Sequence, residues 1–151
     1  MDEKQIFTIG HSTRSLDELV KVLKYYGIEV LVDVRHFPRS GHNPQFNKEV
    51  LEDKLPEIGI QYLWIEALGG FRKGGYEEYM KTKDFQGGLE TLMDIAKQRP
   101  AAVMCAELLW FRCHRRLIAS ALRRRKWQVI HIYDEKKKEA HRALRRKRAI
   151  L

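Results

Sequence analysis

Cysteine is scarce in this sequence, and its scarcity excludes one class of protein. The 151 residues contain only two cysteines, Cys105 and Cys113. A small secreted domain that depends on disulfides has several cysteine pairs, and here one of the two cysteines lies inside an apolar stretch. The sequence therefore predicts a fold held by an ordinary hydrophobic core, for which the apolar share of 44% is sufficient.

Long apolar runs are also missing. No stretch approaches the ~20 apolar residues that span a bilayer. The N-terminal stretch MDEKQIF is charged and has no signal-peptide core. We therefore expect a soluble protein in a reducing, cytoplasmic setting. We also find no internal repeat, no low-complexity segment and no linker that would divide the domain.

Positive charge, by contrast, is abundant and unevenly distributed. The net charge is +9, and the segment from Glu135 to Leu151 holds eight Lys or Arg against two Glu, a net +6. A second basic cluster spans Arg123 to Lys126. Such charge attracts phosphates, nucleic acid or anionic lipid head groups, and a solvated helix is the alternative. We expect an α/β domain over residues 1–134, followed by a basic tail or helix over residues 135–151.

Apolar runs that alternate with helical patterns predict the fold class. Ser15 and Glu18 form a capping-box pattern before a helix with apolar residues at helical spacing. Further helices are expected after Asn47, near Glu77, over 85–96 and over 112–125. The expected strands cover residues 5–9, 29–34, 61–65, 102–106 and 127–132. This alternation predicts a single α/β domain with a mostly parallel sheet of about five strands and helices on both faces. It leaves the strand order open.

Three polar clusters follow three of the expected strands. They are His11 to Ser15, Asp33 to Ser40, and Cys105 to Arg115. Because ligands bind beyond the carboxyl ends of parallel strands, these clusters predict one site at one edge of the sheet. We expect catalytic roles for Cys113, Glu107, His11 and Asp33. We expect the substrate to contact Ser12, Arg14, Arg35, Arg39, Ser40, His114 and Arg115.

Each of these residues has a simpler interpretation. Cys105, within an apolar strand, is most simply a core residue, and Cys113 could be an inert structural thiol. Asp33 and Arg35 could form only a structural ion pair. His11 could simply bond backbone groups near the helix that starts after Ser15. Five such residues at one edge of the sheet nevertheless exceed structural need, so their joint occurrence favours a functional site.

The same motifs carry a family resemblance. The chain resembles the uncharacterised family catalogued as domain of unknown function 488, and the resemblance extends to about Tyr133. It rests on the stretches 8–15, 33–40, 68–70, 105–107 and 113–115. The resemblance implies a single α/β domain whose motif residues form the site, and it implies no particular activity.

The residue types in the site suggest two functions. A cysteine at a helix start beside arginines resembles phosphatase and rhodanese sites, although their Cys-to-Arg spacing is absent here. We therefore expect an enzyme, a cysteine-dependent or acid/base-dependent hydrolase or transferase, acting on a phosphate-bearing or nucleic-acid-related substrate. The alternative is a non-catalytic nucleic-acid-binding module that uses the basic tail. A metal site built from His, Cys, Asp and Glu is conceivable, but without tight ligand motifs we predict neither a metal nor a cofactor.

Overall fold

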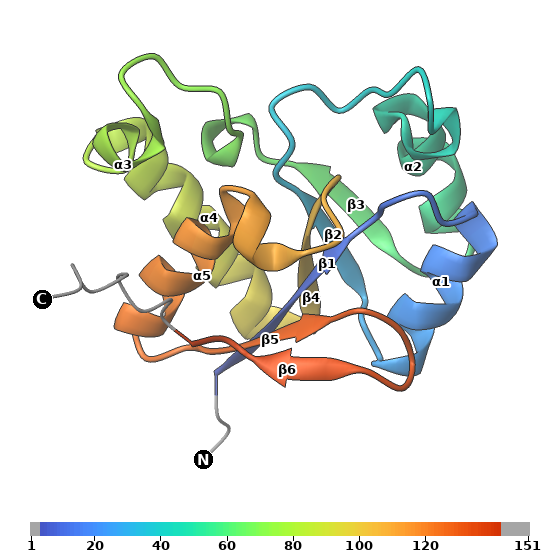
Figure 1. The fold of residues 1–151 in the computed structure, drawn as a ribbon. Helices are drawn as coiled ribbons and strands as arrows, with labels where there is room; N and C mark the ends of the chain where they lie inside the picture. The colour runs from blue at the N-terminus through green and yellow to red at the C-terminus, as the bar shows by residue number, and fades with distance from the viewer. Residues whose placement is uncertain (1–3, 143–151) are drawn as a thin grey trace, which may run out of the picture.

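In the computed structural model, which describes residues 4–142, six strands form one sheet with helices on both faces (Figure 1). The strands are β1 (Gln5–Gly10), β2 (Val30–Asp33), β3 (Gln61–Trp64), β4 (Ala101–Cys105), β5 (Gln128–Ile132) and β6 (Lys138–Ala140). Their order is β3-β2-β4-β1-β5-β6, with β6 antiparallel and the other strands parallel. The predicted α/β class and all five predicted strands are confirmed.

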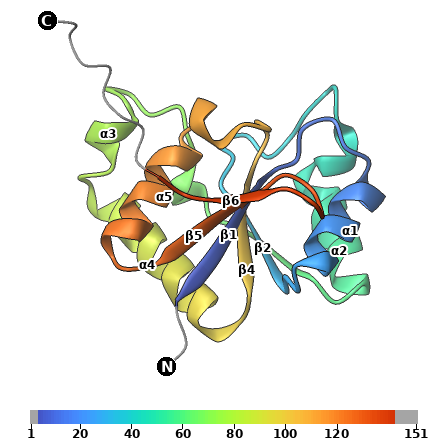
Figure 2. The same cartoon turned by 60° about the horizontal axis from the view of Figure 1, so that its bottom comes forward.

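Two layers of helices bury the apolar faces of the sheet. The α-helices are α1 (Leu16–Tyr25), α2 (Lys48–Glu57), α3 (Tyr76–Tyr79), α4 (Lys83–Gln98) and α5 (Arg115–Arg124). Helices α1 and α2 cover one face, and α4 and α5 cover the other (Figure 2). The chain steps in one direction along the sheet from β1 to β3 and in the opposite direction from β3 to β5. Right-handed crossovers require that this reversal places the two helix pairs on opposite faces.

Side-chain caps account for the starts of α1 and α4, where Ser15 and Thr82 accept from backbone N–H groups of the first turn. The predicted capping box forms, because the Ser15 hydroxyl accepts from Glu18 N and the Glu18 carboxylate accepts from Ser15 N. Asn47 stands at the start of α2, but its side-chain oxygen accepts a hydrogen bond from Ser40 N at 2.7 Å instead of capping the helix. Asn47 therefore ties down the preceding loop.

The predicted domain boundary after residue 134 is wrong, because β6 continues the sheet beyond it. A buried chain of hydrogen bonds fastens this strand. His131 on β5 is bonded to Thr8 on β1 and to His141 Nδ1 at 2.9 Å, and His141 Nε2 is bonded to Ser120 Oγ at 2.9 Å. The Trp110 ring stacks on His131 with centroids 4.4 Å apart. The segment 135–142 is therefore part of the domain, and the rest of the predicted tail, 143–151, lies outside the described residues.

The strand order places the three polar clusters side by side. Strand β4 lies between β2 and β1, so the carboxyl ends of these three strands are neighbours. Gly10 is opposite Cys105, and Asp33 is opposite Met104. The loops that leave these ends therefore start within one or two strand spacings of one another.

Candidate active site

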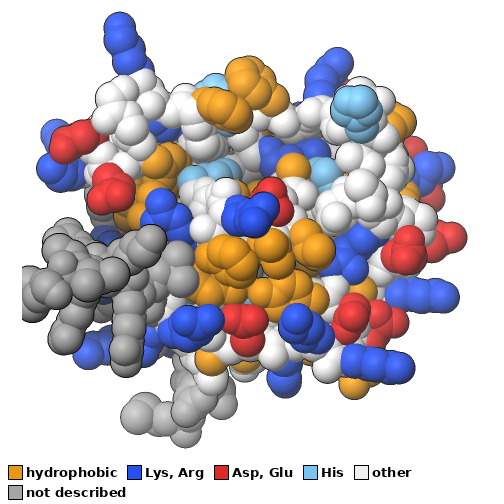
Figure 3. All heavy atoms as spheres, in the orientation of Figure 1, with side chains coloured by type: hydrophobic (Ala, Val, Ile, Leu, Met, Phe, Trp, Pro, Cys, Tyr) orange, Lys and Arg blue, Asp and Glu red, His pale blue; other side chains and the backbone are white. Residues whose placement is uncertain are grey.

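A cavity of about 850 Å³ opens beyond these three strand ends. Its lining comes from the segments 11–13, 35–43 and 105–114, together with the glycine-rich loop around Gly70. The space-filling view shows a hollow in this face of the molecule, with histidine and basic side chains in and around it (Figure 3). The three polar clusters thus lie together at one edge of the sheet, as the sequence predicts.

Two thiols face each other in the cavity wall. Cys105 is the last residue of β4 and Cys113 precedes α5, and their sulfur atoms are 3.0 Å apart, hydrogen-bonded and not in a disulfide. Cys105 is buried in the core, as the simpler interpretation expected, and its exposed fraction is 2%. Cys113 is partly exposed and also accepts a hydrogen bond from Arg115 N at 3.3 Å. The structure therefore pairs a buried thiol with an accessible one.

A buried guanidinium lies close to this pair. The Arg115 side chain is 1% exposed and donates to the carbonyl oxygens of Glu107 and Leu108 at 3.2 and 3.1 Å. Its Nε and Nη1 atoms have no partner within residues 4–142, and no carboxylate there pairs with it. A buried charge without a counter-ion is costly. A thiolate at Cys113 would supply the negative charge that Arg115 lacks.

The surroundings of the two thiols separate their acidities. The hydrogen bond from Cys105 and the positive charge and N–H of Arg115 outweigh burial and lower the pKa of Cys113 to about 7. The hydrogen bond to Cys113, together with burial, raises the pKa of Cys105. Above about pH 7 the pair consequently holds one proton, with Cys105 as the thiol and Cys113 as the thiolate.

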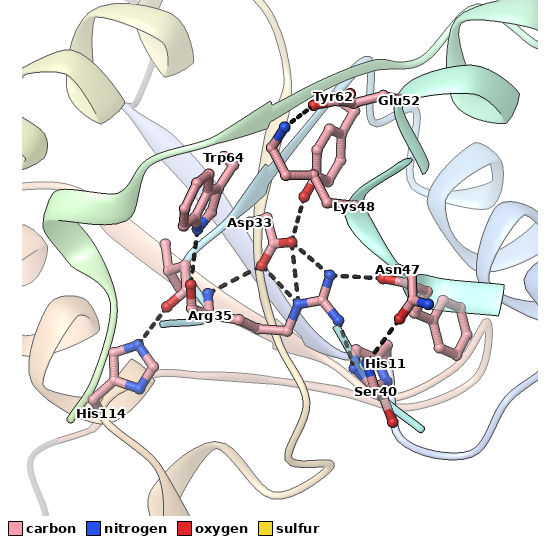
Figure 4. A network of polar contacts seen from close by, with 12 residues as sticks. His11, Asp33, Arg35, Ser40, Asn47, Lys48, Glu52, Tyr62, Trp64 and His114 are labelled. Atoms are coloured by element: carbon pink, nitrogen blue, oxygen red, sulfur yellow. Dashed lines mark hydrogen bonds and ion pairs between the residues drawn. The ribbon is translucent and has the colours of Figure 1, made fainter. Parts of the chain in front are cut away.

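Asp33 and Arg35 form the centre of a buried polar network (Figure 4). Asp33 is fully buried and accepts from the backbone N and side chain of Arg35 and from the Tyr62 hydroxyl. Arg35 also donates to the Phe46 carbonyl at 2.7 Å. The two residues thus form the structural ion pair of the simpler interpretation, and Asp33 does not line the cavity. The network fixes the direction in which the chain leaves β2.

His11 belongs to the same network. Its Nδ1 lies 2.8 Å from the Ser12 carbonyl, so this nitrogen carries the proton, and Nε2 then accepts from Arg35 Nη1 at 3.3 Å. The ring stacks on Phe46, and burial lowers the pKa of His11 to about 4. Both ring nitrogens are therefore engaged, and His11 positions the cavity wall.

His114 connects β2 to the glycine-rich loop. Its Nε2 donates to the Val34 carbonyl at 2.7 Å, and burial lowers its pKa. A Cβ on Gly70 would lie 3.2 Å from the His114 ring, so a larger residue there would push against the ring. The lack of a side chain at Gly70 therefore lets the glycine-rich loop pack closely against the His114 ring.

Aromatic and basic side chains surround the cavity mouth. Phe37 and Phe71 are 66% and 84% exposed, with ring centroids 5.9 Å apart, and His36 contacts both. Phe71 has a φ of 54°, which is unfavourable for a bulky residue and is most often tolerated where function requires it.

The lining contains four arginines and a single carboxylate: Arg35, Arg39, Arg72, Arg112 and Glu107. Of the arginines, Arg112 has no side-chain partner among the described residues.

Most, though not all, of the residues predicted for the site line the cavity. Those that do are His11, Ser12, Arg35, Arg39, Ser40, Glu107, Cys113 and His114. Asp33 and Arg115 lie behind the wall, and Arg14 donates to the carbonyls of Gly10 and Tyr133. These three side chains therefore do not line the cavity, and their hydrogen bonds are made within the protein. Arg39 is exposed and pairs with Glu49 at the surface.

Sequence reasoning missed several lining residues. The apolar neighbours of Cys105 in the sequence favour a core residue and give no sign of its partner. Arg72, Phe71 and Tyr76 come from the glycine-rich loop, which the sequence marks only by its composition. His36 and Phe37 lie inside the second polar cluster. Two aromatic rings between Arg35 and Arg39 are the sequence signal that could have identified them as lining residues.

Gly10 lets the loop after β4 cross over β1. A Cβ at this position would lie 1.9 Å from the Glu107 carbonyl oxygen and 2.8 Å from the Leu108 Cα. We expect Gly10→Ala to lower the free energy of unfolding by about 2–3 kcal/mol, because a backbone segment must move. Gly41→Ala is the matched control: a Cβ there meets nothing, and we expect a change within about 0.5 kcal/mol. Urea unfolding of both variants measures these changes. Equal changes in the free energy of unfolding would show that the loop after β4 can move away from residue 10 at no cost.

Within residues 4–142, no group of three or more His, Cys, Asp or Glu residues is arranged to hold a metal ion. No helix in this part of the chain is both long and apolar enough to cross a membrane. A model of the family described as domain of unknown function DUF488 matches residues 15–122. Comparison with curated proteins and with solved structures gave no match.

Proposed function

The chain belongs to the DUF488 family of domains of unknown function, and we propose that it is an enzyme that transfers or hydrolyses phosphate groups with Cys113 as nucleophile. The observation that carries the proposal is the environment of this sulfur atom. The Cys113 sulfur atom shares a hydrogen bond with the Cys105 sulfur atom and accepts one from Arg115 N, beside a buried guanidinium and at the wall of a cavity. Such an environment stabilises a thiolate, which is the nucleophilic form of cysteine.

The charge of the cavity favours an anionic substrate. Glu107 is the single carboxylate in a lining that has four arginines, and Arg35 among these is already neutralised by Asp33. Arg112 is exposed and unpaired within the described part of the chain, and the partner of Arg39 is an exposed carboxylate that binds weakly. Arginine donates in a plane that suits phosphate oxygens. We therefore assign phosphate binding to Arg112 and Arg39.

The rim favours a substrate that also carries an aromatic ring. Phe37 and Phe71 expose their rings at the mouth, and the buried Nδ1 of His36 has no hydrogen-bond partner among the described residues. Aromatic side chains stack on nucleobases with little regard to base identity. A nucleotide, free or within a single strand, fits this combination of rings, arginines and thiolate.

The proposed reaction has two steps. The Cys113 thiolate attacks phosphorus, the phosphorus–oxygen bond to the leaving group breaks, and the leaving oxygen takes a proton. Glu107, as the one carboxyl group on the lining, is the candidate donor of that proton. Water, deprotonated by the Glu107 carboxylate, then attacks the phosphocysteine, which releases phosphate and restores the thiolate and the acid.

The pH dependence of alkylation tests the nucleophile. We expect iodoacetamide to modify Cys113 with a half-maximal rate near pH 7, rising with pH, because only the thiolate reacts. In Cys105→Ala we expect this midpoint to rise by about one pH unit, since a hydrogen bond of about 1.4 kcal/mol is lost. Peptide mapping assigns the modified cysteine. A midpoint that is the same in both proteins would contradict the role of Cys105 as donor.

Phosphate release tests the activity itself. Nucleoside 5′-phosphates, single-stranded oligonucleotides and p-nitrophenyl phosphate are the probes, and Cys113→Ser should lose at least a hundredfold of any activity found. Ribose 5-phosphate, which lacks a base, should react more slowly than the nucleotides. Equal rates for the wild type and Cys113→Ser, or no release from any probe, would contradict the proposal.

The alternative, a nucleic-acid-binding module that uses the basic tail, rests mostly on residues outside those described. It predicts polyanion binding that falls steeply with salt and survives Cys113→Ser. No contact among residues 4–142 favours it over the enzyme, so it stays a prediction from the sequence.

A further inference from the structure

We propose that Cys105 and Cys113 form a redox-active dithiol that reduces hydroperoxides, with Cys113 attacking the peroxide and Cys105 resolving the product. The proposal goes beyond phosphate chemistry and does not depend on it. It rests on the distance between the two sulfur atoms, on their different exposure and on the unpaired guanidinium of Arg115 beside them.

The geometry of the pair suits a disulfide. The sulfur atoms are 3.0 Å apart, and a disulfide bond of about 2.05 Å needs only about 1 Å of further approach. Cys105 ends β4, and Cys113 lies in the loop segment between η3 (Trp110–Arg112) and α5. One sulfur atom is thus held by a strand at the centre of the sheet and the other by a loop.

The two thiols differ in the way that attack and resolution require. Cys113 lines the cavity and is partly exposed, so a peroxide can reach it, and the nearby positive charge of Arg115 favours its thiolate. Cys105 is 2% exposed, so bulky reagents are kept away, but Cys113 is within its reach. The more accessible thiolate of Cys113 therefore reacts first, and the buried Cys105 thiol then attacks its oxidised neighbour.

The reaction balances in two steps. The Cys113 thiolate attacks one peroxide oxygen, the O–O bond breaks, and the departing oxygen leaves as hydroxide or alkoxide and takes a proton from water, which leaves a sulfenic acid at Cys113. The Cys105 thiol then attacks this sulfur atom, an S–S bond forms, and the sulfenic oxygen leaves with the thiol proton as water. The two sulfur atoms lose two electrons in total, which the peroxide gains. An external dithiol restores the reduced pair by thiol–disulfide exchange.

One equivalent of hydrogen peroxide, added to the reduced full-length chain at pH 7, tests the proposal without any other substrate. We expect the thiol count under denaturing conditions to fall from two to zero and the intact mass to fall by two hydrogen atoms. Dithiothreitol should restore both values. The product should be monomeric, since the bond forms within one chain.

Two serine variants serve as matched controls. In Cys105→Ser, Cys113 should stop at the sulfenic acid, which dimedone traps. In Cys113→Ser, oxidation of Cys105 should be at least tenfold slower than loss of thiols in the wild type. The proposal is overturned if Cys113→Ser reacts as fast as the wild type, if the wild type accumulates sulfinic acid at Cys113, or if it forms only disulfide-linked dimers. Failure of phosphate release alone would leave this result unaffected.

Discussion

Asp33→Asn is expected to lower the free energy of unfolding by about 3–5 kcal/mol, the usual cost of removing one partner from a buried ion pair. The Asp33 carboxylate is fully buried, and Arg35 is 5% exposed, so water cannot replace the lost charge. An amide at this position would also turn an N–H₂ group toward donors that now meet an oxygen, including the Tyr62 hydroxyl. Urea unfolding at pH 7 measures the change.

The surface pair of Arg39 and Glu49 offers a matched control. It joins the same two chemical groups, but its side chains are 72% and 56% exposed. Glu49→Gln should therefore leave the free energy of unfolding nearly unchanged. If Asp33→Asn does not fold, Tyr62→Phe removes one hydrogen bond to the same carboxylate, and we expect it to cost about 1.5–3 kcal/mol. Costs for Asp33→Asn and Tyr62→Phe no larger than that of Glu49→Gln would refute a structural role for the network.

Acidification from pH 7 to pH 5 is expected to destabilise the protein by several kcal/mol. Burial lowers the pKa of His131 to about 2 and those of His11 and His141 to about 4. Their ordinary value in an unfolded chain is about 6.5. Between these pH values the histidines bind protons in the unfolded state but not in the folded state. Their contribution to the free energy of unfolding is therefore fully present above pH 6.5 and decreases as the pH drops toward 4. The limit is roughly 1.4 kcal/mol per pH unit for each histidine.

Thermal melts at half-unit pH intervals measure this slope, and NMR observes its cause. In the folded protein the ring protons of His131 and His141 should keep their chemical shifts down to pH 5. In His131→Gln, unfolding should take up as much as one proton fewer, so the free energy of unfolding should depend less steeply on pH. This holds even if the variant is less stable overall. A melting temperature that stays constant from pH 7 to pH 5 would contradict the exclusion of protons from these three rings.

The sequence predicts the fold class because its signals are local. Apolar runs define five strands, and Ser15 with Glu18 defines a helix start. Strand β6 is not predicted, because its sequence Lys-Glu-Ala has no apolar run. Pairing with β5 and the hydrogen bonds between His131 and His141 hold it in the sheet. The strand order is likewise a property of pairing between distant segments, which no local pattern contains.

The candidate site was predictable in position but less so in the role of each residue. Strand ends marked by polar clusters locate the cavity. The burial of Arg115 could not be read from the sequence, because an arginine without a nearby carboxylate is normally expected at the surface. The pairing of Cys105 with Cys113 depends on how the loop between β4 and α5 returns the chain to the end of β4. Such contacts follow from the tertiary structure alone.

The central position of β1 in the sheet determines when the protein can fold during synthesis. This strand is the first to leave the ribosome, yet its two partners are β4 and β5, which lie about a hundred residues further along the chain. Pairings of such long range close large loops and form slowly. Strands β2, β3 and β4 can associate earlier, but residues 5–10 have no partner until β4 has been made. Until then the unpaired residues 5–10 would be a place for a chaperone to bind or for nascent chains to aggregate.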